Sequence, residues 1–256
     1  MKLRTLIEMS QSAMNSYGAG LTVDGSFGPK TEAAAEKFDF ILTAKPKAAR
    51  VAPLMPAKFT EPEFVRVKGV KFKGVKKYAT KTGMFEGLVV HYTVSGRSAN
   101  SAIGVLKFLA GHKDNLGCMV MDEDGKIYTP EDFNIFTDSA NHAGTSEWAG
   151  RKALNHYYAG MEICCMGLGS RIGPLRVSKG EENIMPGSYQ EYTPKQEAAL
   201  TNFILWAQSK NPAFSIDRVC GHDEARTEAG LKGDKSDPGA SLSMTMPKYR
   251  AYLRGL

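Results

Sequence analysis

The stretch Leu88-Val89-Val90-His91 places a histidine directly after a short, continuous and β-branched run. Such a run predicts a strand that is covered on both faces. A second histidine, His222, follows the apolar run that ends at Val219-Cys220-Gly221. Polar groups at the ends of core strands lie at the rim of a sheet, where sites tend to gather. We therefore expect both histidines at one edge of a sheet. For either histidine alone, a capping or hydrogen-bonded structural role is the alternative.

The sequence on both sides of these runs alternates between strand and helix patterns. A capping box with proline at the first helical position, Thr193-Pro194-Lys195-Gln196, starts one predicted helix. An Asp-Gly turn at 124–125 predicts a hairpin. We expect further strands at 64–67, 70–73, 160–164 and 216–220, and further helices at 98–110 and 247–253. Because the order lacks strict strand–helix–strand regularity, we predict the α+β class, a mixed β-sheet flanked by helices.

The pattern of the N-terminal part of the chain predicts a separate module. Two short helical patterns flank a loop punctuated by Asp24-Gly25 and Gly28-Pro29. The stretch that follows has four prolines among alanine and lysine, which is typical of a semi-stiff linker. We predict a small all-α module at 1–42, a linker at 43–63 and the main domain at 64–256.

Composition limits the classes of protein that fit. The chain has 256 residues, of which 42% are hydrophobic and 23% charged, close to globular averages. Its net charge of +6 comes from residues 41–85, which carry 11 basic and 2 acidic side chains. The remainder is close to neutral, so we expect no nucleic-acid partner. We also expect a monomer.

Targeting signals and disulfides are not expected. No apolar run approaches a membrane span, and the N-terminus lacks the apolar core of a signal peptide. The four cysteines include an adjacent pair and show no metal-ligand spacing, so we predict reduced, buried thiols. They are Cys118, Cys164, Cys165 and Cys220.

The residues after His222 suggest a metal site. They include the carboxylates of Asp223, Asp234 and Asp237. Two neutral imidazoles and one carboxylate can hold Zn²⁺ and leave a fourth position open. The spacing alone does not establish such a site, because the sequence has no HExxH-type pair of local ligands.

Four segments with histidine, carboxylate or lysine side chains follow one another along the chain: His91-Tyr92-Thr93, Asn141-His142-Ala143-Gly144, Gly160-Met161-Glu162-Ile163, and Gly221-His222 with Lys235-Ser236-Asp237-Pro238-Gly239. In this order they resemble the zinc-dependent N-acetylmuramoyl-L-alanine amidases. That family includes the amidase-type phage lysozymes and shares its fold with the peptidoglycan recognition proteins. The resemblance extends from about Gly87 to Leu253. Residues 21–31 are similar to the central loop of a peptidoglycan-binding module, so the whole chain resembles a modular phage endolysin.

The resemblance implies a role for each matching residue. His91, His222 and Asp237 would bind Zn²⁺. Glu162 would be the general base, and Lys235 would stabilise the oxyanion. The residues expected to contact substrate are His142, Asn141, Thr93 and Trp148, with His142 contacting sugar or peptide and not metal. The residues expected to contact the cell wall are Asp24, Gly25, Phe27, Gly28 and Thr31.

Two departures from the family pattern affect these roles. Some relatives have a Tyr-His pair at the place of Cys118-Met119, and its tyrosine aids catalysis. In this chain that catalytic role would therefore fall to Glu162. The loop between His222 and Asp237 is longer than in many relatives. Asp223 and Asp234 therefore remain alternatives for the third ligand.

The expected function is hydrolysis of the amide bond between N-acetylmuramic acid and L-Ala in peptidoglycan, by a phage endolysin. Without a signal peptide, the protein would be made in the host cytoplasm and would reach the wall through a holin. A non-catalytic peptidoglycan-recognition protein and a bacterial wall-recycling amidase are the alternatives. A zinc D-Ala-D-Ala peptidase would need a different His/Asp constellation, which we do not find.

The basic stretch Lys68–Lys77 has two interpretations. Lysines on a solvated edge strand discourage pairing between sheets. The second interpretation is attraction to anionic polymers of the cell envelope.

Overall fold

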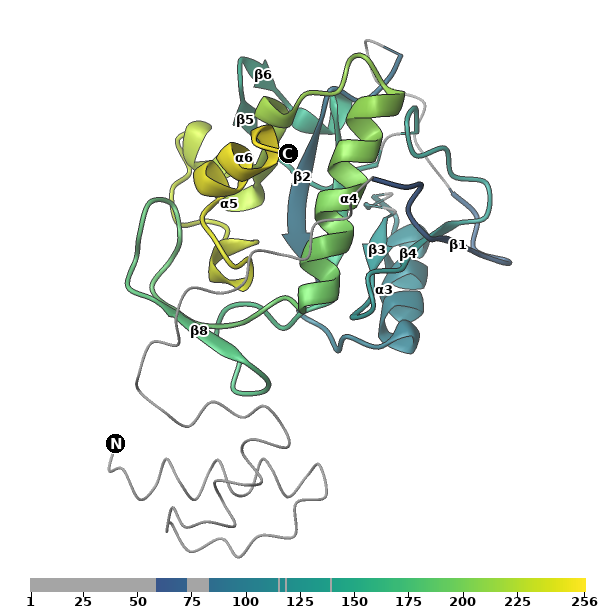
Figure 1. Cartoon of the computed structure of the whole chain (residues 1–256). Helices are drawn as coiled ribbons and strands as arrows, with labels where there is room; N and C mark the ends of the chain where they lie inside the picture. Colours follow the sequence, from purple (N-terminus) through teal and green to yellow (C-terminus); the bar gives the residue numbers. More distant parts are fainter. Residues whose placement is uncertain (1–58, 73–82, 115, 118, 139) are drawn as a thin grey trace, which may run out of the picture. The chain divides into compact units, whose positions relative to one another are not determined.

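A six-stranded mixed sheet forms the centre of the described part of the computed structural model (Figure 1). Its strand order is β1-β4-β3-β7-β2-β10. The structure describes residues 59–72, 83–114, 116–117, 119–138 and 140–256, which all belong to the unit Pro53–Leu256. The predicted cell-wall module and its residues therefore lie outside the described part. The strands are β1 (Phe64–Val67), β2 (Gly87–Tyr92), β3 (Val120–Met121), β4 (Ile127–Pro130), β7 (Tyr158–Ile163) and β10 (Val219–Gly221).

The strand that carries the first histidine is paired on both sides. β2 runs parallel to β7 and to β10, and within the described six-stranded sheet only β3 and β4 pair antiparallel. The first five residues of β2 are buried, as expected for a strand covered on both faces. Parallel strands bring their carboxyl ends to one edge of the sheet, which places His91 and His222 at that edge.

Side chains that alternate along β2 and β7 enter two different cores. Leu88, Val90 and Met161 pack with the helices α4 (Pro194–Lys210) and α6 (Met246–Arg254). On the other face, Val89 packs with α5 (His222–Glu228), and a further cluster packs β3 and β4 against α3 (Ala99–Gly111). Helices therefore cover both faces of the sheet, and the predicted α+β class is confirmed.

Local sequence signals account for the starts of α3 and α4. The Thr193 side chain accepts from the Gln196 amide at 3.0 Å, and the Gln196 side chain accepts from the Thr193 amide at 2.9 Å, so the capping box at α4 is confirmed. The Ser98 side chain caps α3 by accepting from the Ser101 amide. The Asp-Gly hairpin between β3 and β4 is also confirmed, and Gly125 has φ +86°.

The strand expected at 70–73 is wrong for residues 70–72. β1 ends at Val67, and a turn at Gly69 with φ +79° redirects the chain. The Val70 amide donates to the Val67 carbonyl, and the Phe72 amide donates to the Asp132 side chain. The amides of Val70 and Phe72 are therefore satisfied by a turn and a carboxylate, not by a neighbouring strand.

Two small antiparallel hairpins and three short 3₁₀ helices complete the described part. No helix in it is long and apolar enough to cross a membrane. Three of the four cysteines lie in it, all free and buried, which confirms the prediction for Cys164, Cys165 and Cys220. The remaining elements are β5 (Glu147–Trp148), β6 (Arg151–Lys152), β8 (Leu175–Ser178), β9 (Gly187–Gln190), η2 (Leu154–His156), η3 (Ile216–Arg218) and η4 (Gly239–Ser241).

Candidate functional site

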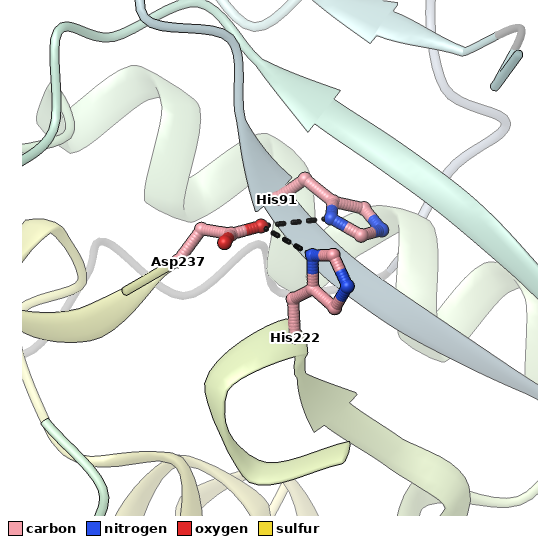
Figure 2. A group of neighbouring side chains, drawn as sticks. All are labelled: His91, His222 and Asp237. Atoms are coloured by element: carbon pink, nitrogen blue, oxygen red, sulfur yellow. Dashed lines mark hydrogen bonds and ion pairs between the residues drawn. The ribbon is translucent and has the colours of Figure 1, made fainter. Parts of the chain in front are cut away.

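Three side chains from distant parts of the chain meet at the carboxyl edge of the sheet (Figure 2). The Oδ2 atom of Asp237 lies 2.8 Å from Nδ1 of His91 and 3.1 Å from Nδ1 of His222. All three residues are buried, and each offers one ligand atom within 4.8 Å of the others. The predicted trio is therefore brought together.

Backbone contacts fix the segments that carry these side chains. His91 lies near the end of β2, where its carbonyl accepts from the buried Tyr192 hydroxyl at 3.0 Å. His222 opens α5, and the next amide, of Asp223, donates to the Asp237 carbonyl at 2.8 Å. A Cβ atom at Gly221 would come within 2.6 Å of Pro238, so only glycine lets the two ligand segments approach this closely.

The protonation states of His91 and Asp237 favour the binding of a cation. Burial lowers the pKa of His91, which favours the neutral imidazole that metals require. Burial alone would raise the pKa of Asp237, but hydrogen bonds to His222 and His91 outweigh it and hold this pKa well below its usual range. Asp237 therefore stays ionised.

The separations also fit one small ion. Zn²⁺ binds nitrogen and oxygen at about 2.0–2.2 Å, which sets ligand atoms of a tetrahedral ion roughly 3.3 Å apart. Both histidines turn Nδ1 toward the same carboxylate oxygen, and Nε2 of His222 is buried without a hydrogen-bond partner in the described structure. Two imidazoles and one carboxylate are the donor set expected of a zinc site with an open fourth position.

The two alternative carboxylates are engaged elsewhere. The exposed Asp234 pairs with Arg226. Asp223 is buried and accepts from the Glu224 amide at 2.8 Å, and burial raises its pKa well above the usual range. Within the described residues, Asp237 is the carboxylate that completes the histidine pair.

Glu162 lies beside the trio on the neighbouring strand. It pairs in register with His91 across β7 and β2, so both side chains point to the same face of the sheet. Burial and the charge of Asp237 raise the pKa of Glu162 to about 8, and the positive charge of Lys235 acts in the opposite direction. Lys235 is exposed and also lowers the pKa of His91, so its charge acts at both residues. Their catalytic roles remain predictions.

His142 lies beside His91, and its predicted contact with substrate remains a prediction. Its Nδ1 atom lies 3.2 Å from Nε2 of His91, and its Nε2 atom lies 3.0 Å from the Tyr158 carbonyl. Both ring nitrogens are engaged within the protein, which argues against contact with sugar or peptide through them. The Asn155 side chain, which the sequence did not single out, accepts from the amides of His142 and Ala143 at 3.0 and 2.9 Å.

The other predicted substrate residues have internal partners. Thr93 is half-buried and bonds Ser95 at 2.6 Å. The Asn141 side chain accepts from the side-chain Nδ2 of Asn155 at 3.1 Å and donates to the Asp114 carbonyl. The Trp148 indole donates to the Asp217 carbonyl at 3.0 Å, and the Arg250 guanidinium stacks over its ring. Substrate contact by these three remains a prediction.

Two tyrosines near the site were missed by sequence reasoning. The Tyr92 hydroxyl bonds Ser236, the residue before Asp237, and Tyr192 bonds the His91 carbonyl. Tyr92 was visible in the sequence, since it follows His91 in the first matching segment. Tyr192 precedes the capping box of α4, and no local pattern connects it to residue 91.

The family model for N-acetylmuramoyl-L-alanine amidase matches residues 81–240. The chain belongs to this family. The match contains all three members of the buried trio as well as Glu162 and Lys235. The amidase-family match starts beyond the predicted N-terminal module and linker and leaves both untested.

Solved structures resemble this amidase-family chain at low sequence identity. A selenomethionine derivative of AmpD is 20% identical, covers 75% of this chain and 93% of its own, and has a TM-score of 0.44. The endolysin amidase LysCS from Clostridium intestinale is 16% identical over 77% of this chain and 99% of its own, with a TM-score of 0.47. The Apis mellifera protein PGRP-SA is 15% identical over 68% and 86%, with a TM-score of 0.43. No curated protein matches the sequence.

Proposed function

We propose that the chain is a zinc-dependent N-acetylmuramoyl-L-alanine amidase that hydrolyses the amide bond between N-acetylmuramic acid and L-Ala. The observation that carries this proposal is the buried convergence of His91, His222 and Asp237 beside Glu162, inside the segment that matches the family. When bound, Zn²⁺ would polarise the amide carbonyl and activate a water molecule for attack.

Glu162 and Lys235 would supply the other groups that the reaction needs. Glu162 is suited to hold and release a proton near neutral pH, because burial raises its pKa to about 8 in the metal-free protein. The exposed Lys235 carries a positive charge that acts at Glu162 and His91, so its ammonium group can stabilise negative charge that develops on the carbonyl oxygen.

One digestion tests the proposal. Purified murein is incubated with zinc-loaded protein, and the products are analysed for stem peptides with a free N-terminal L-Ala. We expect these peptides to appear, and EDTA to abolish them. Release of D-Ala, or no cleavage with zinc present, would refute the proposal. Binding to murein without cleavage would support the alternative of a non-catalytic recognition protein.

We further propose that the protein acts as a phage endolysin, made in the host cytoplasm and admitted to the wall by a holin. The resemblance of residues 21–31 to a peptidoglycan-binding loop supports this, because a soluble wall fragment needs no anchor to polymer. Cells that express the protein should lyse only after their inner membrane is permeabilised. A recycling amidase would instead cleave soluble muropeptides and leave permeabilised cells intact.

A further inference from the structure

The ring of His142 lies between the metal trio and the backbone of β7. One chain of contacts runs from the Tyr158 carbonyl to Nε2 of His142 at 3.0 Å, and from Nδ1 of His142 to Nε2 of His91 at 3.2 Å. It ends at Nδ1 of His91, 2.8 Å from Asp237. Figure 2 shows the second ring nitrogen of His91 turned away from Asp237.

Hydrogen-bond chemistry fixes the proton positions along this chain. A carbonyl oxygen only accepts, so Nε2 of His142 carries the hydrogen. In a neutral imidazole the other nitrogen is then a bare acceptor, so Nδ1 of His142 accepts from Nε2–H of His91. His91 is consequently left with a lone pair on Nδ1, the atom that faces Asp237 and His222.

A neutral His91 ring has one hydrogen, so it cannot donate both to His142 and to Asp237. In the metal-free structure Nδ1 of His91 also lies at hydrogen-bond distance, 2.8 Å, from Oδ2 of Asp237, and this hydrogen bond competes with the one to His142. A metal ion held by Nδ1 of His91 and Oδ2 of Asp237 would remove the competition and leave the hydrogen on Nε2, where His142 accepts it.

The position of the His142 ring is set by its neighbours. A Cβ atom at Gly160 would lie 2.6 Å from Cγ of His142, so the ring fills space that only glycine leaves on this face of β7. Asn155 fixes the backbone on the other side, through the amides of His142 and Ala143. The ring has little freedom to turn toward a ligand in solvent.

We propose that His142 is a positioning residue that holds His91 in the tautomer whose Nδ1 atom binds the metal. This inference rests on the proposed zinc site. Partners behind ligating histidines set ring orientation and tautomer, and their loss typically weakens metal affinity 10- to 100-fold. His142 therefore acts on the metal through His91 and touches neither metal nor substrate.

Two amide variants separate this role from general packing. In His142→Asn, the side-chain oxygen can stand near the position of Nδ1 and still accept from His91. In His142→Gln, the amide reaches the position of Nε2, so it keeps the contact with Tyr158 and loses the one with His91. Both replacements are polar and uncharged, which makes them a matched pair.

The first measurement is the dissociation constant of Zn²⁺, obtained by competition with a chromophoric chelator. We expect His142→Gln to weaken binding about 10- to 100-fold and His142→Asn to stay within a few-fold of the unchanged protein. Gly160→Ala, which displaces the ring without altering it, should weaken binding as well. Thermal unfolding of the metal-free proteins reports whether each variant folds.

The second measurement is the ¹⁵N spectrum of the histidine side chains with zinc bound. It should show that Nε2 of His91 carries a proton. The chemical shift of that N–H group should change in His142→Gln and stay the same in His142→Asn. Equal affinity of the two amide variants would overturn the inference, whether both bind as well as the unchanged protein or both lose affinity. Failure of the unchanged protein to bind zinc would instead refute the proposed function.

Discussion

Two carboxylates at the site, Glu162 and Asp237, have opposite pKa shifts. Burial raises the pKa of Glu162 to about 8, whereas hydrogen bonds to two histidines outweigh burial and lower the pKa of Asp237. Carboxylates whose environments separate their pKa values usually have different tasks. Asp237 is thereby suited to remain a charged ligand, and Glu162 to exchange a proton.

Glu162→Gln should therefore stabilise the metal-free protein at alkaline pH. A raised pKa means that the folded chain holds its proton more tightly, so the contribution of Glu162 to stability is complete below about pH 4.5 and is lost as the pH rises to about 8. Because one pKa unit corresponds to about 1.4 kcal/mol, the advantage of glutamine should reach a few kcal/mol at most above pH 8.

Thermal unfolding of both proteins after removal of metal, at pH 5 and pH 9, measures this effect. The difference in Tm between the variant and the unchanged protein should grow from pH 5 to pH 9. A constant difference would show that the carboxyl titrates normally. The same variant should lose most of its amidase activity.

Lys235→Met should reduce kcat by about two to three orders of magnitude, the typical loss for one oxyanion donor. The side chain is exposed, so the fold should be unaffected. Lys232→Met is the matched control, because it removes an exposed lysine from the same loop. Steady-state cleavage of a soluble muropeptide gives kcat for each, and equal activity of the two variants would contradict the role of Lys235.

The metal trio could be predicted from sequence more fully than its surroundings. His91 and His222 each follow a core strand, and the resemblance supplied Asp237. The choice between Asp237, Asp223 and Asp234 depended on the path of the loop. The place of His142 depended on Gly160, a contact between residues 18 positions apart that no local pattern encodes.

At the scale of helices and strands, the sequence predicted a boundary correctly where a local cap or turn determines it. The capping box placed the start of α4, and the Asp-Gly turn placed the β3–β4 hairpin. The strand expected at 70–73 failed for residues 70–72, because the alternation of Val70 and Phe72 reflects burial beside a turn. Alternation reports which side chains are buried, and strand pairing needs a partner that the sequence does not name.

The cap of α4 should matter more for stability than the cap of α6. Thr193 accepts from the Gln196 amide at 3.0 Å and donates to the Glu123 carbonyl at 2.7 Å. Thr245 precedes α6 without a side-chain bond to that helix. Thr193→Ala should cost about 1 kcal/mol of unfolding free energy, and Thr245→Ala clearly less. Urea unfolding measures both, and similar losses would contradict this difference.

At the scale of the whole molecule, the positive charge is concentrated between the predicted module and the matched family segment. Half of the stretch Lys68–Lys77, residues 73–77, lies outside the described residues. Of its described part, Lys71 pairs with Glu131. That ion pair supports a solvated surface role for Lys71, and the attraction to anionic envelope polymers remains a proposal for the stretch as a whole.

Replacement of Lys71, Lys73, Lys76 and Lys77 by Gln tests that proposal. Lysis of permeabilised cells should fall more at low salt than at high salt, since salt screens exposed charges. Cleavage of soluble muropeptides serves as the control and should not change. Equal losses on cells and on soluble fragments would refute attraction to the envelope.

The order in which the trio appears along the chain has a consequence for synthesis. A ribosome makes His91 first, then His222, and Asp237 last of the three. A nascent chain that stops short of Asp237 has both imidazoles but lacks the carboxylate that joins them. The trio can therefore form only after Asp237 has been synthesised, and chains released by a stalled ribosome before that point should lack it.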